Sequence, residues 1–224
     1  MASYKLNIAT IRSCPPVKDV LKALDDYGLP ENEPYGVLST SSSETAVFAT
    51  IARRTHQAVQ RLQTETRELT STEVEKVAVY PFAIKPKSHV LEVYAGSAAA
   101  VKYIEEFMAG ALGIAVATEP IELDIPAAIN KLVADTQRFV LKSLRVEDYA
   151  HNSYMAGPYA PKFLDSVHGM EFLEEYSQTV TSAGVRFAGP TGRVTVTLKA
   201  QAAFSYSCNE DDQSEVQSIL RKLL

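Results

Sequence analysis

The chain has 224 residues, of which 46% are hydrophobic and 22% are charged. This composition is typical of a globular protein with a substantial core, and it excludes a collagen, a disordered tail and a disulfide-dense miniprotein. The 22 basic and 27 acidic residues give a formal net charge of −5, which argues against a strongly basic nucleic-acid-binding module. Charge can still gather on one face, so a local basic surface is compatible with this total.

No segment of the sequence has the length of a membrane span. The uncharged stretch 107–118 is short and is interrupted by Gly110 and Gly113, whereas a span needs about 20 apolar residues. The first residues show neither a basic leader nor an apolar segment, so secretion is not indicated. We therefore expect a cytoplasmic protein, of prokaryotic type, that has no contact with a membrane.

The first part of the chain predicts a strand, a helix and a hairpin. Residues 4–12 alternate in polarity, as a strand does, and 16–28 show helical spacing between two prolines and Gly28. The segments 36–41 and 46–55 flank a polar turn and predict a β-hairpin. The polar stretch 56–72 fits either a continuation of the strand or an exposed connection, and the sequence leaves both open.

Two β-rich segments follow, 74–84 and 88–96, and Pro81 indicates an edge or a bulge in the first of them. Ser97 then begins a helix with an apolar face that ends near Gly113.

The middle of the chain predicts a helix that Asp124 and Pro126 begin. We expect this helix to bury Ile129, Leu132 and Val133. Residues 138–146 fit a strand better than an extension of the helix, because Thr136 interrupts the apolar stripe. Residues 149–165 contain three tyrosines and two prolines and predict a long irregular segment, of a length that is often functional in a compact domain.

The last part predicts a short helix around Leu173, a hairpin and a final helix. The hairpin turns at 189–192, and its second strand, 193–207, alternates strictly between apolar and polar residues. We expect Asn209 to cap the last helix, with Asp211 and Asp212 at the positive end of its dipole.

These elements predict an α+β fold of antiparallel sheets with amphipathic helices packed on one face. The order of elements is similar in 1–113 and 138–224, with 114–137 as a connecting strand and helix segment. Two pseudo-repeated halves and one continuous compact domain are both compatible with this order.

A polar sheet face could bind a polyanion through its cations. Strand spacing places Arg193, Thr195, Thr197 and Lys199 on one face, with the two cations about 20 Å apart, so that they could follow a phosphate backbone. The alternative is an ordinary solvated sheet face. The candidate nucleic-acid-binding residues are Arg53, Arg54, Arg138, Lys142, Arg186, Arg193 and Lys199.

The segment 149–165 is the second candidate surface, because its aromatic rings carry polar tips, as residues of contact surfaces do. The alternative is a loop held in place by its own tyrosines. The candidate interaction residues are Tyr149, His151, Asn152, Tyr154 and Tyr159.

Catalytic and metal motifs are missing from the sequence. It has no GxSxG, Walker A, GxGxxG or HExxH motif, and Cys14 and Cys208 lack the spacing of a zinc site. We therefore predict no catalytic residues, no metal and no cofactor.

Two hypotheses about function follow. The first is a non-enzymatic component of a larger assembly that is associated with nucleic acid and that contacts protein partners or further copies of itself. The second is an enzyme of unfamiliar type with a site at 149–165, in which His151 or His168 acts as the general base.

Overall fold

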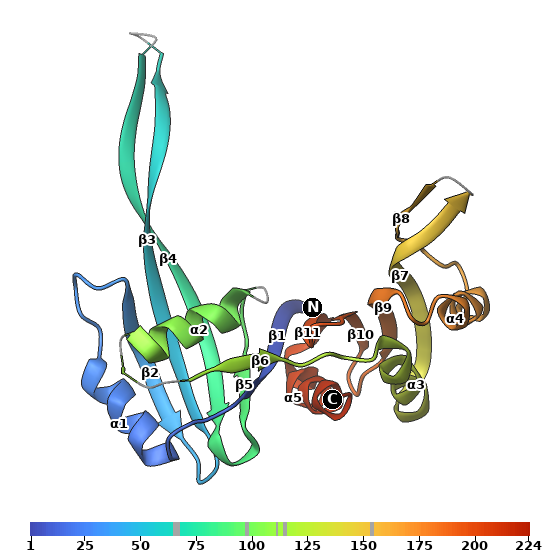
Figure 1. The fold of residues 1–224 in the computed structure, drawn as a ribbon, viewed down its shortest axis with the longest axis horizontal. Coiled ribbons are helices and arrows are strands. Elements are labelled where there is room, and N and C mark those ends of the chain that lie inside the picture. Colours follow the sequence, from blue (N-terminus) through green and yellow to red (C-terminus); the bar gives the residue numbers. More distant parts are fainter. Residues whose placement is uncertain (65–67, 97–98, 111, 114–115, 153–154) are drawn as a thin grey trace. The chain divides into compact units, whose positions relative to one another are not determined.

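The computed structural model describes residues 1–64, 68–96, 99–110, 112–113, 116–152 and 155–224 (Figure 1). The chain divides into two compact units. The N-terminal unit contains Ile11–Ala95 and Ala99–Thr118, and the C-terminal unit contains Met1–Thr10 and Glu119–Leu224. The helices and strands bear out the predicted α+β class, and every strand pair whose register is described is antiparallel.

The N-terminal unit is a four-stranded sheet with the strand order β2-β3-β4-β5. In its core, Val20 and Leu24 of α1 and Phe107 of α2 pack with residues of the sheet, such as Ile51 and Phe82. Each of these side chains is at most 1% exposed. The elements are α1 (Val17–Tyr27), β2 (Tyr35–Ser42), β3 (Val47–Gln63), β4 (Glu68–Lys85), the 3-10 turn η1 (Pro86–Ser88), β5 (Val90–Val93) and α2 (Ala99–Gly110).

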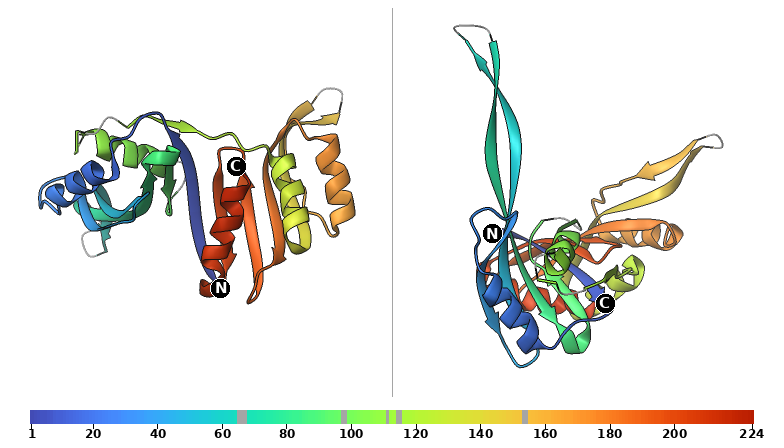
Figure 2. Two further views of the ribbon diagram at one scale, coloured as in Figure 1. Left: turned by 90° about the horizontal axis from the view of Figure 1, so that it is seen from below. Right: turned by 60° about the vertical axis from the view of Figure 1, so that its left-hand side comes forward.

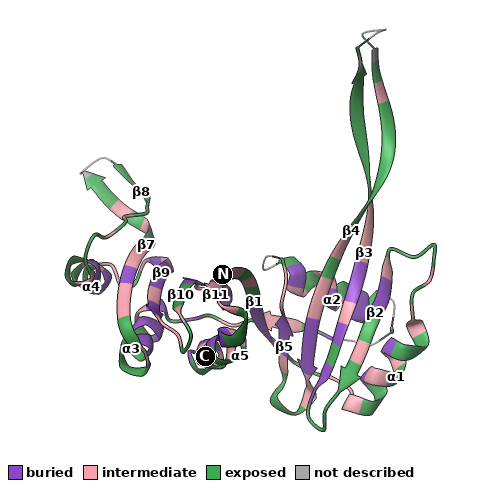
Figure 3. Cartoon of the chain, turned by 180° about the vertical axis from the view of Figure 1, so that it is seen from behind, coloured by how far each residue is buried: buried purple, intermediate pink, exposed green. Residues whose placement is uncertain are grey.

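The stretch 56–72 continues the hairpin wherever the structure describes it. β3 and β4 stay paired out to Gln63 and Glu68, far beyond the part of the sheet that the helices cover. Most of this ribbon is exposed, as the green colouring of Figure 3 shows. Its polar composition follows from the absence of a covering layer, and this is why sequence pattern alone could not assign it.

Pro81 belongs to a continuous strand and not to a bulge. The pairing of β3 with β4 runs through Thr50 and Pro81 without a shift of register. The carbonyl of Pro81 accepts from the backbone N–H of Tyr94, just past the end of β5. β4 lies between β3 and β5, so the expected edge strand was wrong; the missing N–H of the proline is tolerated because it falls where β5 ends.

The C-terminal unit has the strand order β1-β11-β10-β9-β7-β8. The helices α3, α4 and α5 lie on one face of this sheet, where they contact β7, β9 and β11 (Figure 2). The elements are β1 (Ala2–Ile11), α3 (Ile125–Asp135), β7 (Gln137–Asn152), β8 (Met155–Tyr159), α4 (Ser166–Glu175), β9 (Val180–Ala188), β10 (Arg193–Lys199), β11 (Ala203–Cys208), η2 (Glu210–Asp212) and α5 (Gln213–Lys222); a further short strand, β6 (Thr118–Pro120), spans the division between the units.

The first strand belongs with the C-terminal elements, although the sequence suggested a first half made of 1–113. β1 pairs with β11 from Ala2 opposite Cys208 to Asn7 opposite Ala203. Backbone hydrogen bonds across some 200 residues of sequence therefore decide where the first ten residues lie. That the two units descend from a duplication stays a prediction.

Three sequence expectations about the C-terminal unit were wrong. The segment 149–165 is not irregular throughout, because β7 continues to Asn152 and β8 pairs with it. The strand expected over 193–207 is broken into β10 and β11 at Ala202, whose φ of 46° lies in the left-handed region. Val133 is 46% exposed, although Ile129 and Leu132 on the same helix are fully buried.

In the part of the chain that the structure describes, none of the helices combines the length and the hydrophobicity that crossing a membrane requires.

Candidate nucleic-acid interface

The sheet of the C-terminal unit has an outer face, opposite α3, α4 and α5, that is polar and basic. On β10 the side chains of Val194, Val196 and Leu198 are fully buried toward the helices, so their neighbours Arg193 and Lys199 point outward and are exposed. The register of the ladder extends this face to the adjoining strands. The outer-face residues are Ser3, Lys5, Asn7, Gln137, Val140, Ser143, Arg145, Ser182, Gly184, Arg186, Ala188, Arg193, Thr195, Thr197, Lys199, Ala203, Ser205 and Ser207.

Four strands of this unit differ in charge from its helices. The strands β1, β9, β10 and β11 carry four cations and no acidic residue; the cations are Lys5, Arg186, Arg193 and Lys199. The segments α3, α4, η2 and α5 carry eight acidic residues and only three basic ones, Lys131, Arg221 and Lys222. A chain with net negative charge thus still presents one positive face, and an anion near that face meets an attractive field.

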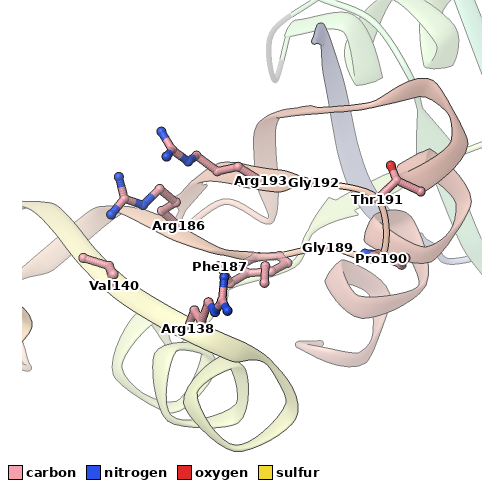
Figure 4. A pocket seen from close by; sticks show the side chains of 10 residues that line it. Arg138, Val140, Arg186, Phe187, Gly189, Pro190, Thr191, Gly192 and Arg193 are labelled. Atoms are coloured by element: carbon pink, nitrogen blue, oxygen red, sulfur yellow. The ribbon is translucent and has the colours of Figure 1, made fainter.

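Three arginines from three strands line one hollow at the edge of the outer face. The hollow has a volume of about 540 Å³ and is lined by Arg138, Arg186, Arg193 and the turn 189–192. Figure 4 shows the side chains of Arg186 and Arg193 side by side on their hairpin, with Arg138 extending from β7. No carboxylate is among the lining residues. Guanidinium groups suit phosphate oxygens, which they can bind in a bidentate manner.

The hollow is supported from behind by the junction of β11 and α5. The buried carboxylate of Asp212 accepts from the backbone N–H of Thr191, at 3.1 Å for its Oδ1. The Nδ2 of Asn209 donates to the hydroxyl and the carbonyl of Thr191, at 2.9 and 3.2 Å. These bonds hold the turn that precedes Arg193.

The prediction that Asn209 caps the last helix was therefore wrong, because its side chain bonds to Thr191 instead. Asn209 precedes the 3-10 turn η2, but its side chain makes no capping hydrogen bond there. Asp212 is 1% exposed, and its carboxylate points to the hairpin turn instead of the solvent at the helix end. The sequence alone does not indicate that Asn209 and Asp212 hold the turn, because each lies about 20 residues from its partner Thr191.

Arg138 occupies a backbone conformation that costs energy. Its φ is 54°, in the left-handed region where a residue with a β-carbon is disfavoured by about 1 to 2 kcal/mol. The residue lies at the start of β7, where the pairing with β9 shifts register between Gln137 and Val140. Glycine would relieve this strain, whereas arginine brings a cation to the hollow.

Arg53 and Arg54 belong to the N-terminal unit, whereas the other candidate cations belong to the C-terminal unit. Both arginines make local contacts. The guanidinium of Arg53 lies over the ring of Tyr103, 4.0 Å from the centroid. Arg54 donates to the carbonyls of Pro30 and Glu33, at 2.6 and 3.0 Å, and so fixes the loop before β2.

A hollow of about 370 Å³ beside Arg54 has the wrong charge for a polyanion. Glu31, Glu33 and Glu75 line it together with Arg54 and His56. The three carboxylates outnumber the one guanidinium, so the site repels phosphate.

Lys142 and Lys199 differ in how they relate to the outer face. Lys142 lies in a β7 irregularity, between Leu141 and Ser143, and its carbonyl accepts from the backbone N–H of Phe163. Lys199 lies at the far end of β10, opposite Ser182 and Ala203, and is exposed. The structure therefore places Lys199, but not Lys142, by register on the basic face.

The aromatic candidates form a cluster on the β7–β8 ribbon and α4. The ring of Tyr149 lies 4.4 Å from that of Tyr159, 5.0 Å from His151 and 5.4 Å from Tyr176, between centroids. None of these four side chains is buried, and Tyr159 is 38% exposed. The rings hold one another in place and still present apolar surface. Of the other two candidates, Asn152 ends β7 and Tyr154 lies outside the described residues.

The candidate histidines show no arrangement for catalysis. His168 Nδ1 is 2.8 Å from Asp165 Oδ2 at the start of α4, and this pair is exposed. The carboxylate raises the pKa of His168, and hydrogen bonds from the His168 backbone and ring lower the pKa of Asp165. His151 packs against Tyr149 and Tyr159. Neither histidine lines the arginine hollow or the acidic hollow.

Other groups that could carry chemistry have structural roles or are inert. Glu92, 1% exposed, pairs with Lys85 and accepts from the hydroxyl of Tyr94 at 2.6 Å. Burial raises the pKa of the Cys14 and Cys208 thiols, so both are poor nucleophiles. Within the described ranges, no group of three or more histidine, cysteine, aspartate or glutamate side chains could hold a metal ion.

Two outer-face cations were not among the sequence candidates. Lys5 lies opposite Ser205 and donates to its hydroxyl at 3.1 Å. Arg145 lies opposite Ser182 and pairs with Glu147 at 3.0 Å. The alternation of their strands could have indicated their face, but only the pairing of β1 with β11 shows that Lys5 belongs to this sheet.

No protein-family model matches the chain, and no curated protein matches it either.

Proposed function

We propose that this chain is a non-enzymatic component of a larger assembly and that the outer face of its C-terminal unit binds nucleic acid. The observation that carries the proposal is the arginine hollow, which Arg138, Arg186 and Arg193 line without a carboxylate among the lining residues. Phosphate contacts supply most of the affinity of sequence-independent nucleic-acid binding, and arginine is well suited to make them.

The surrounding face supports the same ligand. Hydroxyls of Thr195, Thr197 and Ser205 lie between the cations and can donate to phosphate or sugar oxygens. A small anionic metabolite would need only the hollow, whereas the cations continue along β10 to Lys199, about 20 Å from Arg193 at about 3.3 Å per residue. An extended polyanion uses the whole face.

The exposed aromatic cluster supports the assembly part of the proposal. Tyr149, His151 and Tyr159 lie near the end of a ribbon that also exposes Met155, which is 58% accessible. Aromatic and methionine side chains are enriched in protein interfaces. Several copies or partners on one nucleic acid would multiply the modest affinity that a chain with net charge −5 can have.

The experiment is a titration of fluorescein-labelled DNA and RNA, single- and double-stranded, at about 50 and 200 mM salt, the range over which phosphate-dominated binding changes steeply. Arg186→Glu with Arg193→Glu should abolish binding. The matched control is Lys18→Glu with Lys22→Glu on α1, which changes the net charge equally at exposed positions of the N-terminal unit. Absence of binding at the lower salt, or an equal loss in the control, would refute the proposal. Sedimentation over a range of protein concentrations, with and without DNA, tests the assembly.

A further inference from the structure

All outer-face cations except Lys5 form two groups with a lane of small residues between them. The first group is the arginine hollow. The second group, Arg145 and Lys199, lies at the level of Ser182 on β9, and Arg145 also pairs with Glu147. Between the two groups, one row crosses the strands at the level of Gly184; it consists of Ser143, Gly184, Thr197 and Ser205 and ends at Lys5 on β1.

Strand geometry gives the separation of the two groups. Arg186 lies opposite Thr195, and Lys199 is four residues further along β10. At about 3.3 Å per residue, the Cα positions of these two levels are about 13 Å apart, and Arg193 and Lys199 are about 20 Å apart. A double helix presents two phosphate backbones on either side of a groove that is about 12 Å wide on its major side. The two groups of cations match two backbones that flank a groove.

The lane is open because its residues are small. The hydroxyl of Ser143 occupies the space where a β-carbon of Gly184 would lie, so only this short side chain covers the glycine. The hydroxyls of Thr197 and Ser205 continue this low surface as far as Lys5, which donates to the Ser205 hydroxyl. The base edges in a groove of a duplex can therefore approach the β-strands while the two phosphate backbones contact the cations.

The same residues give single strands no stacking platform. Proteins that bind unpaired nucleic acid without sequence preference stack its bases on aromatic side chains. None of the residues that register places on the outer face is aromatic. The rings of Tyr4 and Tyr206 stack on each other, and Tyr206 is 2% exposed, so its ring is not available to a base.

We infer that the outer face selects double-stranded over single-stranded nucleic acid by contacting both backbones, one at the arginine hollow and the other at Arg145 and Lys199. This inference rests on the proposed nucleic-acid binding and adds the form of the ligand. The selection is by shape, because the side chains of Ser143, Thr197 and Ser205 between the two groups are short. Affinity should accordingly be the same for duplexes of different sequence.

The test compares a 20-base-pair DNA duplex with one of its strands by fluorescence anisotropy at about 50 mM salt, where phosphate-dominated binding is strong. We expect the duplex to bind at least tenfold more tightly. Lys199→Ala should weaken duplex binding several-fold, leave single-strand binding unchanged and lower the salt slope for duplex by about one unit. Arg186→Ala should weaken both.

A second variant fills the lane without changing the charge. Thr197→Tyr should lower the affinity for duplex and raise or preserve the affinity for the single strand, because it adds a ring on which a base can stack. Equal affinity of the unmodified protein for both forms, or an equal effect of Lys199→Ala on both, would overturn the duplex inference and leave the proposed function standing. Failure of both forms to bind would instead refute the proposed function.

Discussion

Replacing Asp212 by alanine tests whether this buried carboxylate holds the turn of the arginine hollow. Its Oδ1 and Oδ2 lie 3.1 and 3.4 Å from the backbone N–H of Thr191, so the two contacts amount to one shared hydrogen bond to a charged acceptor. Such a bond contributes about 1.5 to 3 kcal/mol. We expect Asp212→Ala to lower the free energy of unfolding by about 2 kcal/mol, out of a typical total of about 5 to 15 kcal/mol.

Asp212→Asn should cost less, about 1 kcal/mol, because the amide oxygen can still accept the bond although it carries no charge. The control is Asp211→Ala at the neighbouring exposed position, for which we expect a change within about 0.5 kcal/mol. The assay is urea denaturation followed by circular dichroism, with the slope of the transition used to confirm an unchanged unfolding process. Equal stability of the Asp212→Ala and Asp211→Ala proteins would show that the turn does not depend on Asp212.

Two further predictions follow from strain and from titration. Arg138→Gly should leave the free energy of unfolding unchanged or raise it by up to about 1 kcal/mol, because glycine relieves the strain of the left-handed backbone. The same change should weaken nucleic-acid binding several-fold. A marked loss of stability would show that Arg138 is structural. In an NMR titration the pKa of His168 should lie above its ordinary value, and Asp165→Asn should lower it toward that value. Because the pKa of His168 is raised in the folded protein, its pairing with Asp165 stabilises the fold fully below the pKa of the unfolded state, and this stabilisation is lost as the pH rises through the folded-state pKa of His168. Because the pKa of Asp165 is lowered, its contribution is lost as the pH falls through the folded-state pKa of Asp165. Stability that does not change over the pH interval where His168 titrates would contradict the pairing. His151→Ala with His168→Ala should not affect nucleic-acid binding, and loss of a measured enzymatic activity in this double variant would favour the enzyme hypothesis instead.

Local pattern was sufficient for the parts of the fold that neighbouring residues decide. On β10 the period of two places Val194, Val196 and Leu198 inward and Arg193 and Lys199 outward, as the sequence predicts. The start of α3 is equally local, because Asp124 accepts from the backbone N–H of Ala127, three residues away. Burial and capping of this kind depend on positions within a few residues, so they can be inferred without the fold.

Only the tertiary structure shows which of the seven candidate cations line the arginine hollow. The sequence around Arg54 predicts an exposed arginine on a strand, as it does for Arg186. In the structure, however, Arg54 donates hydrogen bonds to the carbonyls of Pro30 and Glu33 in a loop. Arg138 and Arg186 line one hollow because β7 pairs with β9, across more than 40 residues of chain.

The break at Ala202 and the position of β1 have the same origin. The alternation of 193–207 fits one long strand, yet β11 turns back to pair with β10 on one side and β1 on the other. Ile8 donates its backbone N–H to the carbonyl of Ala202 and so satisfies the backbone at the turn. Residue type and spacing decide which face of a strand is polar, but hydrogen bonds between distant strands decide which polar faces lie side by side, and the basic face of this protein exists only through those bonds.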